Sequence, residues 1–598
     1  MKNKKNRQKI IINLFLVWTF LLTSLPIQAQ NTPPTEELSL GSSVFVFRGS
    51  TKSAQKKNVV RENPGKIRTK TQLAASAKKI RTQYNTLAKV VKRRQRVKPI
   101  AEDELNIARA NPKDAAIALT GAGQYYLEKN DLDKSIYFYR GATDLDKTNQ
   151  DATLGLSDAL AAKGDDLLEN ERTAEAEKVY KEALTFNDKN SSAYAGLGEV
   201  YDILDKNTDA IASYTKALEL DKDLTEIYSP LGILYFYQDN LTKADEFLGK
   251  ALAANKDNAE TQYFLGLIRS KQNRDQDALA AFKKSITLDA VSAETHYALG
   301  ETYEKINKYE KINKSDEAIA EYNEAIKLNP KYVEAFFALG VAQYNKENYK
   351  DAAAAYEKVV KLQNTNGEAH ANLGDTYRLL GDLGKAEGEY RLATYFIKDD
   401  AELFSKFGYV QGAQKKWESS IKALQTANSL SPNVIDYTNL GWAYYNWAQE
   451  DVRANRQAEA TAKTRLAKEA LKKAVNLNKD FAPAFLNLGV ALNDLGEYQD
   501  AVAALKSAIE LKDKWVFAIN ELGRAYYELK DYDKAIAQFQ KAVERDKNFD
   551  KGYYNLGEAQ VRGGFINDAR KTLEKLKSMK SVFYAKSLEA AIVTAKKK

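Results

Sequence analysis

The chain has 598 residues with no cysteine and two histidines, which excludes disulfides, thiolate metal sites and cysteine nucleophiles and leaves little material for a zinc site or a histidine-based triad. Ten prolines and thirty glycines are few for this length, and the abundance of Ala, Leu, Lys, Glu and Tyr favours helix. The net charge of +9 is unevenly distributed, because residues 48–98 carry seventeen Lys or Arg against Glu62 alone and precede an acidic remainder.

Residues 1–29 have the pattern of a secretory signal peptide. Five basic residues precede an apolar run from Ile10 to Leu25, and Ala29 supplies a small residue before a cleavage point. The alternative is a segment kept as a membrane anchor, but about sixteen residues interrupted by polar side chains are short for a span. We therefore predict a bacterial protein that is exported, to the periplasm or out of the cell.

The next part of the chain has two different patterns. Residues 30–70 contain three prolines among polar residues and are expected to be loosely ordered, apart from a short strand at 44–47. In residues 71–111, apolar side chains recur at helical spacing from Leu73 to Val91 among lysines and arginines, which predicts a basic helical segment.

The basic arm, residues 48–98, has three interpretations. In the first, the arm is a tether that docks on the chain's own acidic part or stays solvated. In the second, it contacts anionic envelope polymers or lipid head groups. Nucleic acid is the least favoured partner despite the run from Lys92 to Arg96, because export removes the chain from most of it.

A glycine recurs with a period near 34 residues through most of the chain, usually directly after a leucine. The series is Gly198, Gly232, Gly266, Gly300, Gly340, Gly374, Gly408, Gly441, Gly489, Gly523 and Gly557. A period of 34 maintained over this length is typical of a helical repeat array.

Each unit resembles the tetratricopeptide repeat. In residues 191–222 the residues that carry the resemblance are Tyr194, Leu197, Gly198, Tyr201, Ala210, Tyr214 and Ala217. The resemblance implies an all-α fold, a right-handed superhelical solenoid of about thirteen helical hairpins over residues 112–577. Residues 578–598 are then expected to form a capping helix.

One hairpin of the array is predicted to be unusually long. Fourteen extra residues lie between Tyr444 and Ala467, and no Gly or Pro occurs from Asn446 to Lys479. This composition favours two helices, each lengthened by about two turns, over a disordered loop.

Catalytic chemistry finds little support in the sequence. His296 and His370 occupy a position that is aromatic in other repeats, so we expect them to pack. Carboxylates are spread along helix surfaces in repeat register, and there is no Walker-type phosphate loop. We predict no enzyme activity, no cofactor and no metal site.

The concave face of such an array offers a binding groove, because the first helix of each hairpin lines it in tetratricopeptide proteins. The partner-binding residues predicted in the central units are Ile233, Phe236, Tyr263, Leu267, Tyr297, Phe337 and Val341. A second set comprises Tyr409, Trp442, Tyr445, Leu486 and Val490. Exposed apolar rows mark binding grooves. The alternative is that the register is shifted and several of these residues pack between repeats.

Asparagine recurs two positions before the repeat glycine, and these residues are also predicted to bind a partner: Asn372, Asn439, Asn487 and Asn555. The series resembles the backbone-gripping ladder in the repeat half of O-linked N-acetylglucosamine transferases. A side-chain amide carries a donor and an acceptor, so it can hold a peptide backbone without reading its side chains. Lys406 and Glu521 interrupt the series, and the catalytic half of those enzymes is absent.

These features together predict an exported scaffold or adaptor that binds proteins or peptides in its concave groove. The alternative is an envelope-associated carrier or regulatory subunit that its basic arm anchors to anionic polymers.

Export gives the first testable prediction. The mature protein should begin near Gln30 and be found outside the cytoplasm, because the apolar run and its preceding basic residues direct secretion. Mass spectrometry of the N-terminal peptide from separated cell fractions measures both. A cytoplasmic protein that retains Met1 would contradict the prediction.

Overall fold

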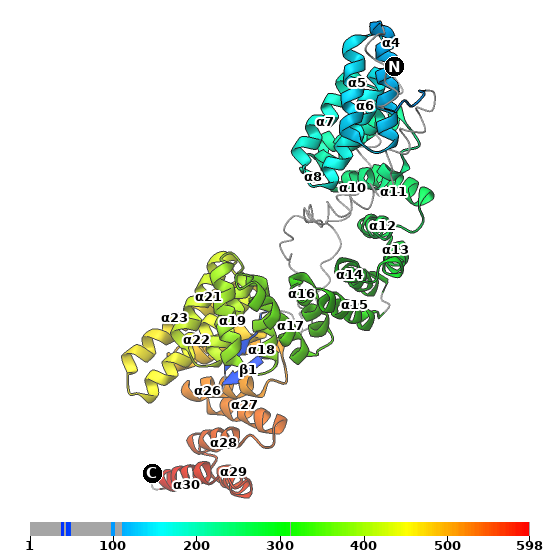
Figure 1. Ribbon diagram of the computed structural model, residues 1–598. Helices are drawn as coiled ribbons and strands as arrows, with labels where there is room; N and C mark the ends of the chain where they lie inside the picture. Colours follow the sequence, from blue (N-terminus) through cyan, green and yellow to red (C-terminus); the bar gives the residue numbers. More distant parts are fainter. Residues whose placement is uncertain (1–36, 41–42, 49–96, 102–110, 311–312, 597–598) are drawn as a thin grey trace, which may run out of the picture. The chain divides into compact units, whose positions relative to one another are not determined.

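A computed structural model describes residues 37–40, 43–48, 97–101, 111–310 and 313–596 (Figure 1). In these ranges the helices from α4 to α29 pair in order as thirteen antiparallel hairpins, and α30 follows as a single helix. The predicted all-α repeat fold is confirmed. One two-stranded hairpin near the N-terminus is added to it.

Contacts divide the chain into two compact units. Unit 1 comprises residues 1–57 and 339–598, and unit 2 comprises residues 58–338. Helix α16, Val333–Asn345, spans the boundary.

The elements of unit 2 are α4 Pro112–Glu128, α5 Leu132–Leu145, α6 Gln150–Glu169, α7 Thr173–Phe186, α8 Ser191–Ile203, α9 Asn207–Leu220, the 3-10 turn η4 Thr225–Ile227, α10 Tyr228–Tyr237, α11 Leu241–Ala254, α12 Ala259–Lys271, α13 Asp275–Leu288, α14 Ala293–Glu310 and α15 Ser315–Leu328.

The elements of unit 1 are β1 Glu37–Leu40, β2 Ser43–Val46, α17 Tyr349–Leu362, α18 Gly367–Leu379, α19 Leu383–Phe396, α20 Ala401–Ala413, α21 Trp417–Leu430, α22 Val434–Arg453, α23 Gln457–Leu477, α24 Ala482–Asp494, α25 Tyr498–Leu511, α26 Val516–Glu528, α27 Tyr532–Arg545, α28 Asp550–Arg562, α29 Ile566–Ser578 and α30 Val582–Lys596.

Asparagine caps start many of the first helices of the hairpins. The side chains of Asn149, Asn190 and Asn366 each accept a hydrogen bond from the backbone N–H three residues later. Such a cap satisfies one of the donors that the first turn leaves unpaired. It fixes where each hairpin begins, and therefore the register of the side chains along the helix.

The repeat glycine allows the two helices of a hairpin to approach closely. A Cβ added to Gly198 would lie 2.5 Å from Cδ1 of Tyr214, and one added to Gly300 would lie 2.6 Å from Cε1 of Tyr322. Both tyrosine rings are buried. A large ring fills the space that the small residue leaves, which explains why the two residue types recur with one period.

The long hairpin is present as predicted. Helices α22 and α23 have 20 and 21 residues, against 13 and 14 in the next hairpin, and only a short turn at Asn455 separates them. The buried carboxylate of Asp451 binds Arg456 and Lys463 across this turn. A buried carboxylate with two cationic partners keeps the helix ends together.

Helix α30 covers the apolar end of the last hairpin through Leu588 and Ile592. The strand predicted at 44–47 is present as β2, one residue earlier. The predicted signal peptide and most of the predicted basic helical segment 71–111 lie outside the described residues. Among the helices that the structure does describe, none is long and apolar enough to cross a membrane.

The close packing of glycine on tyrosine gives a second prediction. Gly198→Ala should destabilise hairpin α8–α9 by about 1–3 kcal/mol, because the added methyl overlaps the ring of Tyr214. Gly249→Ala in α11 is the control: no atom lies within 4 Å of its added Cβ, and replacing a helical glycine gains about 0.5–1 kcal/mol. Thermal melting and amide exchange of both helices measure the effects. Equal changes in the two variants would contradict this account.

Candidate functional site in the groove of unit 1

Strand β2 lies in unit 1 against the first helices of two successive hairpins, α22 and α24 (Figure 1). It pairs with β1 in antiparallel register, with Glu37 opposite Val46 and Leu40 opposite Ser43. The N-terminal part of the chain therefore occupies a surface formed by residues about four hundred positions later.

Two asparagine side chains hold the backbone of β2. Oδ1 of Asn487 accepts a hydrogen bond from the N–H of Val44 (2.8 Å), and its Nδ2 donates to the carbonyl of the same residue (2.6 Å). Asn439 makes the same pair of bonds with Val46, at 2.8 and 2.5 Å. Both amides are buried. These two residues therefore hold the backbone of a segment of the chain itself. That they also hold a partner stays a prediction.

The two asparagines take the place of a neighbouring strand. In an extended chain, the N–H and C=O groups of alternate residues point to opposite edges. Those of Val44 and Val46 face the asparagines, and β1 pairs along the other edge. Since Asn439 and Asn487 belong to successive hairpins, the repeat spacing matches the two-residue period of the strand.

Phe45 enters a pocket between α20 and α22. Its ring stacks on Trp442 at 4.2 Å between centroids and on Tyr409 at 4.8 Å, and it is fully buried. A Cβ added to Gly412 would lie 2.7 Å from Cε1 of Phe45, so a glycine is needed to admit the ring. Stacked aromatic pairs are worth about 0.5–1.5 kcal/mol beyond the area that they bury.

Phe47 lies on the same face of the strand, two residues further. Its ring meets Tyr409 edge-on at 5.0 Å, and the guanidinium of Arg378 in α18 lies 3.8 Å from the ring centroid. This cation–π contact brings a fourth helix into the site, after α20, α22 and α24.

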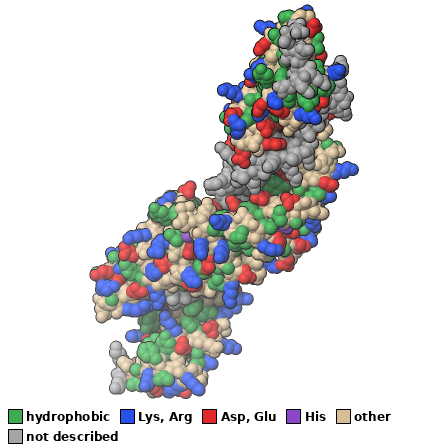
Figure 2. Space-filling model, viewed as in Figure 1, with side chains coloured by type: hydrophobic (Ala, Val, Ile, Leu, Met, Phe, Trp, Pro, Cys, Tyr) green, Lys and Arg blue, Asp and Glu red, His purple; other side chains and the backbone are tan. Residues whose placement is uncertain are grey.

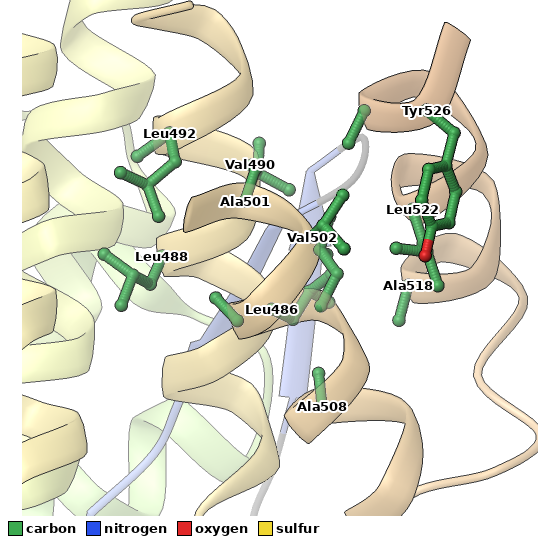
Figure 3. Close-up of a cluster of buried hydrophobic side chains, with 14 of the residues drawn as sticks. Leu486, Leu488, Val490, Leu492, Ala501, Val502, Ala508, Ala518, Leu522 and Tyr526 are labelled. Carbon is green, nitrogen blue, oxygen red and sulfur yellow. The ribbon is translucent and has the colours of Figure 1, made fainter. Parts of the chain in front are cut away.

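Val44 and Val46 point to the opposite face and are part of a buried cluster with residues of α23–α28. Figure 3 shows part of this cluster, with Leu486 and Val490 beside the strands. The groove thus has one aromatic wall and one aliphatic wall, which match the alternation of side chains along β2.

Arg48 ends the described segment and forms an ion pair with the fully buried Asp436, which also accepts a hydrogen bond from Ser405. Burial raises the pKa of the Asp436 carboxyl to about 6, although Arg48 and Ser405 lower it. A buried carboxylate that meets a cation at one end of the strand fixes the direction and register of the bound backbone.

An ion-pair network interrupts the asparagine series. Lys406 stands at the asparagine position of α20, where its Nζ binds Asp375 at 2.8 Å and Glu402 at 3.1 Å. Burial lowers the pKa of Lys406, but the two carboxylates outweigh burial and raise it. The side chain therefore stays charged and committed to its neighbours.

Asn372 and Asn555 do not bond the described strand as Asn439 and Asn487 do. Asn372 of α18 is 8% exposed, and its Nδ2 has no hydrogen-bond partner within the described part of the chain. Asn555 instead donates to Oδ1 of Asn520 in the preceding hairpin at 2.9 Å. Binding of a partner by these two residues stays a prediction.

Four residues of the predicted central row are buried rather than exposed to solvent: Ile233, Phe236, Phe337 and Val341. Ile233 and Phe236 belong to a core cluster of unit 2, where Phe236 meets Phe264 edge-on. The expectation that these four face solvent is wrong, and they fit the alternative of packing between repeats.

Three further residues of the row are half-buried. Tyr263 and Leu267 pack against the same core cluster, and Tyr297 contacts Tyr332 at 5.1 Å. Whether they also contact a partner stays a prediction.

Relative to the repeat glycine, contacts with the segment come from two residues before (Asn439), one after (Trp442) and four after (Arg378, Gly412). The position three before the glycine, which we also predicted, differs between the units: Phe337 is part of the core of unit 2, whereas Leu486 belongs to the buried cluster that includes Val44 and Val46. A step of three along one helix face produces this set, and the recurrence of asparagine was the signal that could have fixed the register.

Both histidines pack as predicted. His296 and His370 are buried, and each Nδ1 lies 2.6 Å from a glutamate oxygen, of Glu321 and Glu389 respectively. Burial lowers the pKa of His370, but the hydrogen bonds to Glu389 and to the carbonyl of Asn364, together with the charge of Glu389, outweigh burial and raise it. Within the described residues no group of acidic or histidine side chains is placed to hold a metal ion.

The fold and the site together define a helical-repeat protein whose groove holds an extended segment of its own chain. Models of the family match the chain at residues 91–152, 161–224, 230–293 and 455–514 ("Tetratricopeptide repeat"), 333–366 (also "Tetratricopeptide repeat") and 307–347 and 523–564 ("TPR repeat"). The chain belongs to the tetratricopeptide repeat family.

Curated relatives match short parts of the chain. The general transcriptional corepressor trfA of Dictyostelium discoideum is 27% identical over 122 residues, which are 19% of this chain and 9% of that protein. The BBSome complex member BBS4 of Bos taurus is 26% identical over 211 residues, 31% of this chain and 40% of that protein. The chain thus covers less than half the length of either relative.

Solved structures also align with the chain. The APC/C hetero-tetramer Cut9-Hcn1 aligns with 80% of this chain and 98% of its own at 15% identity and a TM-score of 0.32. YrrB, described as a TPR protein with an unusual peptide-binding site, aligns with 32% of this chain and 95% of its own at 24% identity and a TM-score of 0.28.

The buried Asp436 gives a third prediction. Its carboxyl should titrate near pH 6 in NMR, and Arg48→Met should raise this pKa further, because the cation favours the charged form. A pKa raised by folding adds stability below the unfolded value of 3.8, and that stability is lost as pH rises through about 6. Stability of unit 1 should therefore fall over this interval, and less so in Asp436→Asn.

Arg453→Met, at the other end of α22, is the control and should leave the titration unchanged. A pKa near 3.8 would show that the carboxyl is not buried as described. A pKa that Arg48→Met does not move would show that the ion pair does not form.

Proposed function

We propose that this protein is an exported, non-enzymatic scaffold that holds extended segments of other proteins in the groove of unit 1. Its family supports a role in protein interaction, and relatives such as the BBSome member are named as parts of complexes. The observation that carries the groove assignment is the double hydrogen bonding of Val44 and Val46 by Asn487 and Asn439.

This geometry supports binding of a strand. Hydrogen bonds to main-chain groups contribute affinity for any extended backbone, whereas pockets for alternate side chains select the sequence. Here Asn439 and Asn487 supply the hydrogen bonds to the main chain, and the pocket formed by Trp442 and Tyr409 receives one of the alternate side chains.

Export rests on the pattern of residues 1–29, and an anchoring role of the basic arm rests on the charge of residues 48–98. Both are proposals from sequence. Acidic and basic side chains alternate over the face of the molecule in Figure 2, so the described array offers no single large patch of one charge on that face.

The fourth prediction tests the backbone grip. In the serine-vacated variant of the full chain, Val44, Phe45, Val46 and Phe47 are replaced by serine, so that the chain's own segment leaves the groove. A capped peptide with the sequence of residues 43–48 is titrated into this variant. It should bind, and Asn439→Ala or Asn487→Ala should each weaken binding about tenfold. Two hydrogen bonds lost at about 0.5–1.5 kcal/mol each account for this factor.

N-methylated peptides provide the matched control. Methyl groups on the amides that correspond to Val44 and Val46 should abolish binding, whereas one on the amide of Phe45, which faces the other edge, should have little effect. Equal losses from all methylated peptides, or no effect of either asparagine variant, would refute the grip.

A further inference from the structure

The groove of unit 1 is filled by the chain's own residues, and the following inference rests on the function proposed above. Four consecutive residues are buried there: Val44, Phe45, Val46 and Phe47. The hydrogen-bond partner of Val44 lies 443 positions later in the sequence, and that of Val46 lies 393 positions later. A groove that binds extended segments therefore already contains one.

We propose that residues 43–48 are an internal ligand that closes the groove, and that a partner protein enters by displacing them with an extended segment of the same chemistry. That segment alternates aliphatic and aromatic side chains and ends in a basic residue, as Val-Phe-Val-Phe-Arg does here.

The contacts of the segment are those that a separate peptide can reproduce. They are hydrogen bonds to backbone groups, ring stacking on Trp442 and Tyr409, and an ion pair with Asp436. None requires that the segment and the groove belong to one chain, so a competing strand finds the same partners.

Two features define what the competitor must carry. The pocket formed by Trp442 and Tyr409, which Gly412 leaves open, fits a flat ring stacked on Trp442. An aromatic side chain is therefore required at the position of Phe45. Asp436 is buried and paired with Arg48, and loss of that cation would leave a buried carboxylate uncompensated. The competitor therefore needs a basic residue three positions after its aromatic anchor.

A tethered segment has the advantage of a high effective concentration, so a displacing partner needs contacts that the segment does not make. Asn372 offers one. It holds the same repeat position as Asn439 and Asn487, it is 92% buried, and its Nδ2 has no hydrogen-bond partner in the described ranges. Phe47 already reaches Arg378 on the same helix, α18, so a strand that continues past the basic residue approaches Asn372.

The experiment compares three full-length proteins: the unmodified chain, the serine-vacated variant and Asn372→Ala. Two labelled peptides are used, the six-residue peptide of residues 43–48 and one extended by Thr-Val at its C-terminus. The chain itself continues with Gly-Ser, whereas β-branched residues favour the extended backbone that would reach Asn372. The six-residue peptide should bind the vacated variant at least tenfold more tightly than the unmodified chain. The extended peptide should bind the unmodified chain more tightly than the short one, and Asn372→Ala should remove this gain.

Each failure has its own meaning. A peptide that does not bind the vacated variant refutes the proposed function itself. Equal binding to the vacated and unmodified chains leaves that function intact and refutes the internal ligand. If the extended peptide binds no more tightly than the short one, the additional contact is refuted. It is also refuted if the extended peptide binds more tightly but Asn372→Ala does not remove the gain.

Two controls keep the test decisive. If the vacated variant does not fold, Phe45→Ala alone weakens the internal segment and should still increase peptide affinity. Sedimentation of the unmodified chain should show a monomer, because the segment binds within one chain. A dimer that dissociates when the segment is vacated would show exchange between two copies and overturn the internal arrangement.

Discussion

A buried backbone must have its N–H and C=O groups hydrogen-bonded, and the groove of unit 1 is organised around this requirement. An extended strand that enters a helical array meets helices whose own backbone groups are already paired. Side-chain amides are the groups that can take both roles, since each carries a donor and an acceptor. Asn439 and Asn487 do so for alternate residues of β2.

The amides can serve one strand because the repeats position them. In each hairpin from α4–α5 to α26–α27 a glycine lets a tyrosine, phenylalanine or leucine of the second helix pack on the first, as Leu471 does on Gly441 and Leu505 on Gly489. This packing sets the separation and rotation of successive first helices. Residues at one repeat position then lie along a line that matches the period of an extended chain.

The same arrangement makes the site selective at little cost to the fold. The aromatic wall of Trp442 and Tyr409, the aliphatic wall around Leu486 and the buried Asp436 each contact a different residue of the strand. Lys406 breaks the asparagine series without leaving an unpaired charge, because Asp375 and Glu402 compensate it. Recognition is therefore divided between a backbone grip and a few pockets.

The sequence by itself determined the features that depend on local periodicity. The 34-residue period predicted the hairpins, and the absence of Gly and Pro from Asn446 to Lys479 predicted the long hairpin. The recurrence of asparagine indicated a backbone grip at Asn439 and Asn487. Only the tertiary structure decided which residues around each glycine face the groove, because a shift of one position in a helix turns a side chain by about 100°, which places Phe337 in the core. It also decided what fills the groove, because contacts between Val46 and Asn439 join segments that no local period relates.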